Sequence, residues 1–407
     1  MDQRVNNSGM TAALAHRASR IKEPPTILMA VKARELRAAG HDVVNLTIGE
    51  PDFDTPDEIK QAANAALAAG QTKYSPIGGI PELRDAISAK LKRDNGLDYA
   101  PSEIVVSNGA KQAITNVCMA FLEPGDEAIV IAPFWAAYTG SIRFADATPV
   151  VVQTRAQNGF RLDLDALEAA ITPKTKLILL NSPSNPSGAV YTRKELEGVI
   201  ALAHKHPHLW ILSDEIYEQI LFDGKHTSPA ALPGGFERTI TVNGVSKSFA
   251  MTGWRIGYTA APAPIAAAIS KVQGMLTAGA NPFAQQAAAF ALKEMQGATK
   301  AMRDAYLERR DMIVTLLRAI PQVKISPPAG AFYAFPDISA YFGRGCGNRR
   351  IDSASDMADY LLDEALVSIV SGESFGDPNC IRISFAASQE EIRKGVERIG
   401  SALRKLT

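Results

Sequence analysis

The stretch TVNGVSKSFAMTGWRIGY, residues 241–258, places one lysine, Lys247, among small and hydroxyl-bearing residues. Two apolar runs flank this lysine, TITVN at 239–243 and RIGYTA at 255–260, and both have the composition of buried strands. No aspartate or glutamate occurs in the stretch. Because a nearby carboxylate would hold the lysine as an ammonium ion, its absence favours an amine that is neutral part of the time and can act as a nucleophile.

Five further apolar runs precede this unit, and helical patterns such as TRKELEGVIALAHKH (192–206) lie between them. The five runs are EIVVS (103–107), EAIVIAP (127–133), TPVVV (148–152), KLILLN (176–181) and LWILSD (209–214). Most are apolar throughout, which is typical of strands buried on both faces. Strand–helix alternation predicts an α/β fold, in which a large domain at about 55–300 holds a mainly parallel seven-stranded sheet covered by helices.

The remainder of the chain predicts a smaller α+β domain at 301–407, against which the N-terminal segment, 1–54, packs through a helix at 26–40. Its expected elements are a helix at 301–320, an extended run at 330–338, a surface loop at 341–355, a helix at 354–365, a strand at 379–386 and a helix from Gln389.

The composition excludes several classes of protein. Lysine plus arginine and aspartate plus glutamate both number 43, so no net charge attracts nucleic acid or an anionic membrane. Three widely spaced cysteines indicate a reducing compartment and argue against both a disulfide framework and a metal site. The basic N-terminus lacks a signal peptide's apolar core, so we expect a cytoplasmic protein, with an organelle transit peptide as the alternative.

Polar residues directly after the apolar runs are candidates for binding, because open α/β sheets bind ligands at the carboxyl ends of their strands. Gly109 begins a helix whose free N–H groups suit an anion, or simply forms a tight turn. Asp214 follows a strand and either caps a helix or pairs with a protonated ring nitrogen, and Tyr217 adds a phenolic donor.

Three more residues extend this set. Asn185 lies in a proline-rich loop at 181–191 that aims its amide, and Trp135 is either a core residue or a stacking platform. Arg382, inside an apolar strand, forms either an internal salt bridge or a carboxylate site. Together with Lys247 as a Schiff-base lysine, these groups suit a phosphorylated pyridine aldehyde, pyridoxal 5′-phosphate.

The chain resembles the class I and II aminotransferases, which are fold-type I pyridoxal-phosphate enzymes, and within them the bacterial subgroup Iβ aspartate aminotransferases, some of which accept prephenate. The resemblance extends from SRIK near residue 19 to the last helix. The motifs that carry it are GEPDFDTP (49–56), KYSPIGGIPELR (73–84), NGAKQA (108–113), NSPSNPSGAVY (181–191), SDEIYE (213–218), NGVSKSFAMTGWRIGY (243–258) and RISFA (382–386).

This resemblance implies the residues that hold the cofactor. Lys247 would form the Schiff base, Asp214 would pair with the ring nitrogen, Asn185 and Tyr217 would bind the phenolic oxygen, and Trp135 would stack on the ring. The phosphate would be held by the backbone of Gly109, Ala110 and Lys111, by the side chains of Ser246 and Arg255, and by Tyr74 of the neighbouring subunit of a homodimer. One departure is Gly244, where many relatives carry a serine that binds the phosphate.

The resemblance also implies an amino-group transfer by a ping-pong mechanism, from an L-amino acid, best taken as aspartate, to a 2-oxo acid such as 2-oxoglutarate. Arg382 would bind the substrate α-carboxylate, beside the backbone of Gly49, and Lys111, Thr26 and Lys22 would select the side chain. Alternatives are an aromatic, alanine-type or prephenate aminotransferase, a pyridoxal-phosphate carbon–sulfur lyase, and a non-catalytic regulator on the same fold.

Overall fold

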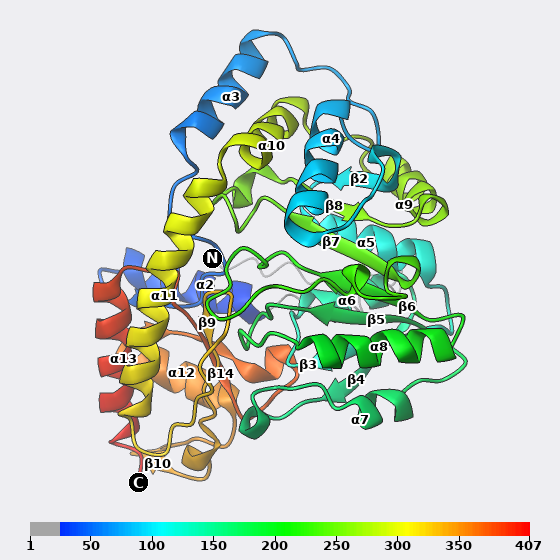
Figure 1. Cartoon of the computed structure of the whole chain (residues 1–407). Helices are drawn as coiled ribbons and strands as arrows, with labels where there is room; N and C mark the ends of the chain where they lie inside the picture. Colours follow the sequence, from blue (N-terminus) through cyan, green and yellow to red (C-terminus); the bar gives the residue numbers. More distant parts are fainter. Residues whose placement is uncertain (1–24) are drawn as a thin grey trace, which may run out of the picture.

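The computed structural model describes residues 25–407 of the chain. Its largest sheet has the strand order β2-β8-β7-β6-β5-β3-β4 (Figure 1). Strand β8 is antiparallel to its neighbours β2 and β7, whereas the other adjacent pairs are parallel. The strands are β2 (Ile104–Ser107), β3 (Glu127–Ala132), β4 (Thr148–Gln153), β5 (Thr175–Asn181), β6 (Trp210–Asp214), β7 (Thr239–Gly244) and β8 (Gly257–Ala260). The predicted mainly parallel seven-stranded sheet is confirmed.

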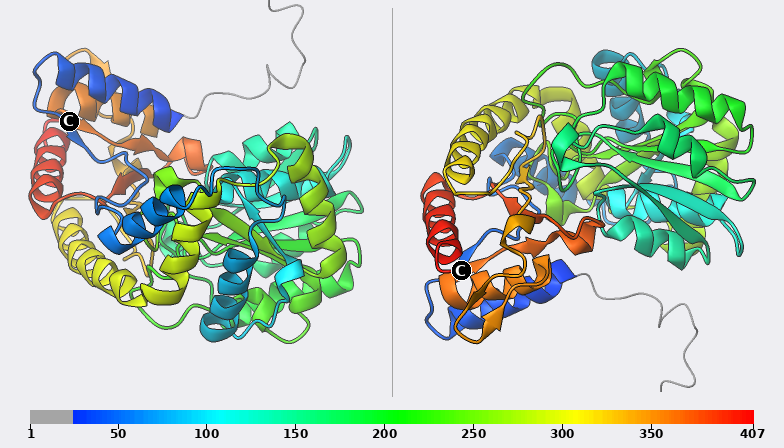
Figure 2. Two further views of the ribbon diagram at one scale, coloured as in Figure 1. Left: turned by 90° about the horizontal axis from the view of Figure 1, so that it is seen from above. Right: turned by 90° about the horizontal axis from the view of Figure 1, so that it is seen from below.

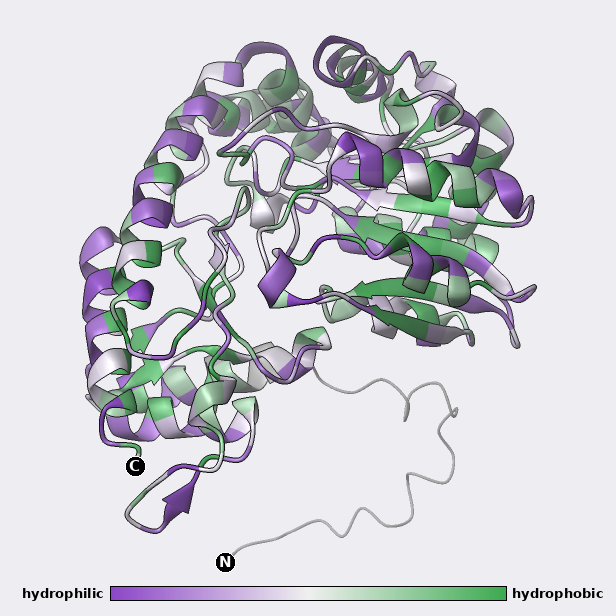
Figure 3. Cartoon of the chain, turned by 60° about the horizontal axis from the view of Figure 1, so that its bottom comes forward, coloured by the Kyte–Doolittle hydropathy of each residue, from purple (hydrophilic) through white to green (hydrophobic). Residues whose placement is uncertain are grey.

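Helices cover both faces of this sheet, because successive side chains of a strand point to opposite faces. In β3, Ala128 and Val130 pack with α5, α6 and α9, whereas Ile129 and Ile131 pack with α7 and α8. In Figure 3 the strands of the large sheet are mainly green, the colour of hydrophobic residues. The helices around the sheet are α3 (Asp57–Ala68), α4 (Pro81–Lys90), α5 (Ala110–Phe121), α6 (Ala137–Phe144), α7 (Leu164–Ala169), α8 (Arg193–Lys205), α9 (Ala263–Leu276) and α10 (Pro282–Glu294).

A second core lies beside the first and is built mainly from the C-terminal third of the chain. Its antiparallel sheet has the order β13-β14-β9. The elements are α11 (Gln296–Arg318), β9 (Tyr333–Ala334), α12 (Ala354–Ala365), β12 (Val367–Ser368), β13 (Val370–Ser371), β14 (Ile381–Ser384) and α13 (Gln389–Leu403). The three helices and the strand predicted here are therefore present, with ends shifted by a few residues.

The N-terminal segment joins this second core. Strand β1 (Val44–Asn45) pairs in parallel with β12, and α2 (Pro25–Ala38) lies against α12. Lys32 Nζ of α2 lies 3.0 Å from Asp359 Oδ1 of α12, and Ala33 packs with Leu362. These contacts support the proposed packing of the N-terminal segment, 1–54, on the smaller domain.

The stretch 341–355, expected to be a surface loop, carries a short antiparallel hairpin of β10 (Gly345–Cys346) and β11 (Arg349–Arg350) whose residues are exposed or half-exposed. Gly347, with φ 58°, supplies the left-handed conformation that a tight hairpin turn requires.

Helix α11 connects the two cores: it follows α10 of the large core and packs against α13 of the second, and Figure 2 shows these as the long yellow helix and the red helix. Because it begins at Gln296, a domain boundary at residue 300 falls inside this helix. The division into 1–54, 55–300 and 301–407 therefore stays a proposal, supported by the two separate cores. Within residues 25–407, no helix is both long enough and apolar enough to span a membrane.

Candidate active site

A cavity of about 720 Å³ lies where β5, β6 and β7 end, between the two cores. Parallel strands of an open α/β sheet place their carboxyl ends at one edge, which is where such sheets bind ligands. The predicted residues that line the cavity are Gly49, Ala110, Lys111, Trp135, Asn185, Asp214, Tyr217, Ser246, Lys247, Arg255 and Arg382. The fold therefore brings together side chains that are up to 333 positions apart in the chain, as between Gly49 and Arg382.

Lys247 follows β7 and is half-buried in the cavity wall. Its Nζ donates a hydrogen bond of 2.6 Å to the carbonyl oxygen of Gly49. Burial lowers the pKa of Lys247 to about 8, although the carboxylate of Glu50 raises it. The stretch around the lysine has no acid, as read from the sequence, but the fold brings Glu50 close from a distant segment. Desolvation outweighs this carboxylate, so a neutral amine is accessible near neutral pH.

Asp214 is the last residue of β6, and it is buried, with 3% of its surface exposed. Its carboxylate accepts hydrogen bonds from the Tyr138 hydroxyl at 2.6 Å and from the Ile216 N–H at 3.2 Å. Burial raises the pKa of Asp214 to about 6, and the bond from Tyr138 lowers it. The residue leads into a turn and no helix, so the helix-cap alternative is wrong.

Arg382 on β14 is buried, with 3% of its surface exposed, and no carboxylate in residues 25–407 pairs with it. Its Nη1 donates to Asn185 Oδ1 at 3.1 Å and its Nη2 to the Thr47 carbonyl at 2.7 Å. The Nε atom has no partner. No salt bridge to Arg382 is present within residues 25–407, so the salt-bridge alternative finds no support there, and a buried guanidinium without a counter-charge lines the cavity.

Tyr217 and Trp135 form aromatic walls of the cavity. The Tyr217 hydroxyl lies 2.8 Å from that of Tyr333 and is fully enclosed, which raises its pKa well above the usual value. Trp135 is half-buried and makes an edge contact with Tyr138, with ring centres 5.6 Å apart. The exposed Lys111 places its Nζ 5.7 Å from the centre of the Trp135 ring. One face of the cavity is thus aromatic and bordered by a cation.

The first turn of α5 forms a second wall with Arg255. Gly109 precedes α5 with φ 85°, and a Cβ atom there would lie 2.3 Å from Arg255 Nη2. Only glycine therefore lets the guanidinium approach the helix N-terminus, where backbone N–H groups lack partners within the helix. Ser246 and Ala110 lie on the same cavity surface. These donors and the cation make a pocket suited to an anion.

The close neighbours of Gly244 explain why this position carries a glycine and not a serine. A Cβ atom at this position would lie 2.8 Å from the carbonyl oxygen of Ile256 and 3.2 Å from Cδ1 of Ile216. A serine would therefore require the backbone of β8 and its approach to shift. The groups that line the cavity near this position and could hold an anion are Ser246, Arg255 and the N–H groups of the helix N-terminus.

Four predicted residues are not among those that line this cavity: Gly109 lies beside it, next to Ala110 and Arg255, and the other three are Tyr74, Lys22 and Thr26. Tyr74 is wholly exposed on the surface of its own chain and does not line the cavity. Lys22 lies outside the residues that the structure describes, and the backbone of Thr26 belongs to α2, but its side chain is not described. Their predicted roles stay predictions.

The structure adds residues to which the sequence assigned no role. Tyr138 binds Asp214, and its position three residues after Trp135, on the first turn of α6, was a usable signal. Arg34, Arg37 and Asn45 reach the cavity from α2 and β1. No local pattern marks these three, because their place depends on how the N-terminal segment packs.

Comparison with known proteins agrees with this arrangement. The family model described as aminotransferase class I and II matches residues 41–399. The bifunctional aspartate aminotransferase and glutamate/aspartate-prephenate aminotransferase of Petunia hybrida is 46% identical over 98% of this chain and 85% of its own length. The aspartate/prephenate aminotransferase of Cereibacter sphaeroides is 45% identical over 95% of this chain and 98% of its own.

Solved structures show the same likeness. The aspartate aminotransferase of Rhizobium meliloti superposes with a TM-score of 0.94 at 41% identity, covering 97% of this chain and 99% of that one. The Thermus thermophilus aspartate aminotransferase with maleate has a TM-score of 0.90 at 42% identity, covering 96% and 99%. The match of the family model over most of the chain, and these full-length likenesses, agree with the fold and the cavity described above. The chain therefore belongs to the class I and II aminotransferase family.

Proposed function

We propose that this protein is a pyridoxal-phosphate-dependent aminotransferase that moves the amino group of L-aspartate to a 2-oxo acid such as 2-oxoglutarate, by a ping-pong mechanism. The observation that carries the proposal is one cavity with three buried or half-buried charged groups, Lys247, Asp214 and Arg382, none of which is paired by an opposite charge in residues 25–407. Unpaired buried charges are costly and mark sites that a ligand completes.

The residues of the cavity fit pyridoxal phosphate. The buried Asp214 carboxylate receives only neutral donors, so it can take a further bond from a protonated ring nitrogen. The pocket formed by the first turn of α5, Ser246 and Arg255 suits the phosphate, and the space at Gly109 is needed for that arrangement. When bound, the cofactor supplies an aldehyde that condenses with amines and a ring that withdraws electrons from the substrate α-carbon.

The side chains divide the remaining work. Arg382 can bind a substrate α-carboxylate through its guanidinium, which has no counter-charge in residues 25–407, and so orient the α-carbon, as guanidinium groups do with planar carboxylates. Lys247 Nζ, with its pKa lowered to about 8, can accept a proton from the α-carbon and return it. Asn185 holds Arg382 in place at 3.1 Å and contributes a polar group beside the same pocket. Tyr217 encloses the pocket against water.

A dicarboxylate substrate is proposed from the chain's free cations and its relatives. Lys111 is exposed on the cavity, and no ion pair involving its Nζ is found in residues 25–407. It can therefore bind a second carboxylate, with Thr26 and Lys22 as the further proposed selectors. The similar Thermus thermophilus enzyme was solved with maleate, a dicarboxylate, and several relatives bear the names aspartate or aspartate/prephenate aminotransferase. A prephenate activity of this chain is the second candidate on that ground.

A homodimer is proposed as the active unit. Tyr74 is wholly exposed, Met275 is 87% exposed, and the apolar side chains of Ile77 and Leu276 are each a little under half exposed. Gly274 and Ile77 are neighbours in space, which ties the end of α9 to the segment that follows Tyr74. An exposed apolar surface of this kind supports contact with a second copy, to whose phosphate pocket Tyr74 would contribute. The cysteines are free, which supports the reducing cytoplasm as the proposed location.

Borohydride reduction of the yellow holoenzyme tests the central assignment. We expect one reduced cofactor adduct per chain, and peptide mapping should place it on Lys247. An adduct on a different lysine would contradict the assignment. Absorption changes after adding single amino acids, without a 2-oxo acid, then rank aspartate, glutamate, alanine and phenylalanine as donors. Ammonia and pyruvate formed without an acceptor would indicate a lyase instead.

A further inference from the structure

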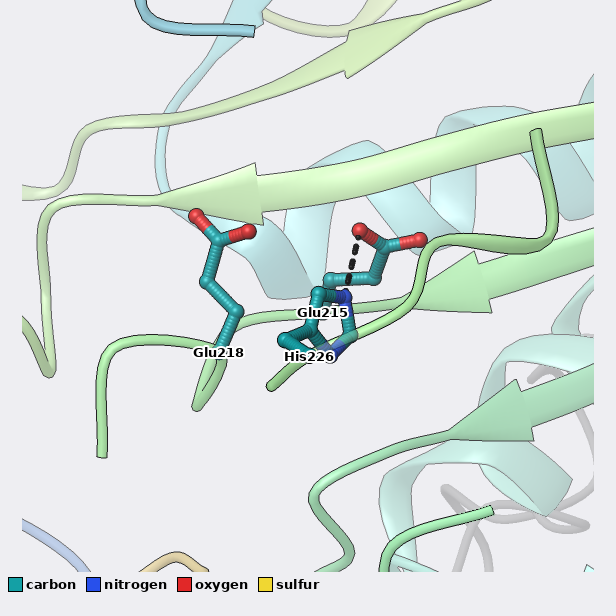
Figure 4. Close-up of side chains that lie close together, drawn as sticks. All are labelled: Glu215, Glu218 and His226. Carbon is teal, nitrogen blue, oxygen red and sulfur yellow. Dashed lines mark hydrogen bonds and ion pairs between the residues drawn. The ribbon is translucent and has the colours of Figure 1, made fainter. Parts of the chain in front are cut away.

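The turn that follows β6 presents different side chains to its two sides. Asp214, Ile216 and Tyr217 line the cavity, whereas Glu215 and Glu218 are buried outside it. Figure 4 shows the side chains of the two glutamates close to that of His226, and none of the three lines the cavity. Glu215 has no exposed surface and Glu218 is 8% exposed, so each carboxylate needs partners within the protein.

Glu215 has partners for both of its carboxylate oxygens. Oε1 accepts hydrogen bonds from Ser213 Oγ at 2.8 Å and from Ser228 Oγ at 2.7 Å. Oε2 lies 3.0 Å from Nε2 of His226. Burial lowers the pKa of His226, whereas the negative charges of Glu215 and, to a smaller extent, of Glu218 raise it. The net effect is a raised pKa. Glu215 is thereby tied to the end of β6 and to the segment around 226–228.

Glu218 is tied to a different part of the large core. Its Oε1 contacts Nζ of Lys90, the last residue of α4, and its Oε2 accepts a bond of 2.7 Å from Asn95 Nδ2. Lys90 Nζ also donates to Asn95 Oδ1 at 2.7 Å. Lys90 is 3% exposed, and it forms an ion pair with Glu218 in which both side chains are buried.

A metal ion is a poor occupant of this cluster. The ligand atoms of Glu215, Glu218 and His226 lie within 4.8 Å of one another. However, the Lys90 ammonium already occupies the cationic position at Glu218, and two hydroxyls and an imidazole already satisfy Glu215. The carboxylates of the cluster therefore already have their partners, and the nitrogen of the cluster left without a partner in residues 25–407 is His226 Nδ1.

We propose that the outward pairs, Glu218 with Lys90 and Glu215 with His226, are positioning residues that set the direction of Asp214 and Tyr217 in the cavity. In a tight turn, fixing the side chains at 215 and 218 restricts the backbone angles of the turn. Those angles also set the direction of the side chains at 214 and 217. The backbone adds to this, since the Glu215 N–H donates to Val242 O and the Glu218 N–H to Glu215 O, both at 2.9 Å. The inference rests on the proposed pairing of Asp214 with the cofactor ring nitrogen.

The test uses a variant that removes the tether without leaving a charge unpaired. Replacing both partners, Lys90→Met with Glu218→Met, substitutes apolar side chains for a buried ion pair, a change that is often nearly neutral for stability. Apoprotein is titrated at pH 8 with pyridoxal phosphate and with the analogue in which CH replaces the ring nitrogen. The ratio of the two dissociation constants reports the Asp214 bond alone, because phosphate, aldehyde and ring contacts are common to both ligands.

In the wild type we expect pyridoxal phosphate to bind about 10- to 100-fold tighter than the CH analogue, as one charge-assisted hydrogen bond provides. In the double variant the ratio should fall to about 3- to 10-fold, because a misdirected hydrogen bond loses much of its strength. A loss of general structure would weaken both ligands equally and leave the ratio unchanged.

Two controls separate the possible failures. Lys92→Met with Asp98→Met removes a neighbouring exposed ion pair of 3.1 Å and should keep the wild-type ratio. Asp214→Ala should bring the ratio to about 1. If Asp214→Ala does so and the double variant keeps the wild-type ratio, the positioning proposal is overturned. If Asp214→Ala also keeps the wild-type ratio, the proposed pairing with the ring nitrogen fails, and the positioning proposal fails with it.

A second variant covers the case in which the double variant does not fold. Glu215→Gln keeps the shape of the side chain and an acceptor for Ser213 and Ser228, but removes the carboxylate charge that faces His226. The pKa of the wild-type Asp214 is about 6 and the Glu215 charge raises it, so the Asp214 carboxylate is ionised at pH 8 with this charge present or removed. A ratio about 2- to 5-fold below the wild type supports the proposal, and a wild-type ratio overturns it.

Discussion

The buried charged side chains on the two sides of the 214–218 turn differ in whether the protein supplies a partner of opposite charge. Towards the cavity, Asp214 has only neutral donors, and Arg382 and Lys247 are held by amide and carbonyl oxygens. Away from the cavity, Glu215 and Glu218 each have a cationic or ionisable partner at hydrogen-bonding distance. Both sides are buried, so burial alone does not distinguish a site from a support. The distinction is whether the protein supplies the counter-charge itself.

This difference predicts opposite responses to mutation. Where a buried charge is paired with an opposite charge of the same protein, removing one partner should destabilise the fold. Where it leaves charges for a ligand, removing a group should affect activity first and can stabilise the fold, because sites are built at the expense of stability. The following changes test this contrast.

The largest effect is expected on stability from Lys90→Met alone. It leaves the Glu218 carboxylate buried without its cation, which should lower the free energy of unfolding by about 3–5 kcal/mol. Urea unfolding measures this loss. The matched exposed change, Lys92→Met, should remain within about 1 kcal/mol of the wild type. Equal losses for both variants would mean that the paired side contributes no more than a surface ion pair.

Arg382→Ala should act on activity with every amino-acid donor, because every donor carries an α-carboxylate. We expect kcat/KM to fall by the equivalent of about 2–5 kcal/mol, as for truncated buried charge pairs. The unfolding free energy should change far less than kcat/KM, since no carboxylate of residues 25–407 depends on this guanidinium. Steady-state kinetics with aspartate, alanine and phenylalanine check this, and a loss confined to aspartate would contradict the role.

Lys111→Ala should act on dicarboxylate donors alone. Removing one charge-assisted hydrogen bond costs about 1.5–3 kcal/mol, so kcat/KM for aspartate should fall while that for alanine stays within a few-fold. The ratio of the two values is the measurement, with Lys176→Ala on β5 as a lysine control outside the cavity. An unchanged ratio would leave an aminotransferase of different specificity.

Asp214→Asn should stabilise the cofactor-free protein while it abolishes turnover. Burial raises the folded-state pKa to about 6 from the ordinary 3.8, so the folded chain binds a proton more tightly than the unfolded one. Stability is therefore lost as pH rises through about 6, and at pH 7 the amide should recover up to about 3 kcal/mol. Urea unfolding at pH 7 and pH 4 should show this gain shrinking at the lower pH. A destabilised Asp214→Asn protein at pH 7 would show that the carboxylate serves the fold.

Much of the fold and part of the site could be predicted from the sequence. The seven sheet strands are apolar runs of local origin, so composition alone reveals them. Lys247 and Asp214 are polar residues at strand ends, where the architecture itself indicates a site. The motifs NSPSNPSGAVY and RISFA, which resemble motifs of the aminotransferase family, likewise indicated Asn185 and Arg382 as site residues.

Other features depend on contacts that no local pattern contains. The effect of Glu50 on Lys247 requires two segments 197 positions apart to meet, and the same holds for Arg34 and Asn45 on the cavity wall. The partners of Glu215 and Glu218 likewise come from α4 and from the segment at 226–228. A buried carboxylate and a reactive one look alike in sequence, because each is an acid beside apolar residues.

The exposure of Tyr74 has a genetic consequence. On the proposed dimer, a chain with Tyr74→Ala damages the cavity of its partner, whereas a chain with Lys247→Ala damages its own. When the two variants assemble together, one cavity carries both defects and the other carries neither. Two inactive proteins mixed and reassembled at random should then regain about a quarter of the wild-type sites, as expected for a two-fold dimer. Mutations at these two positions would complement each other within a single gene.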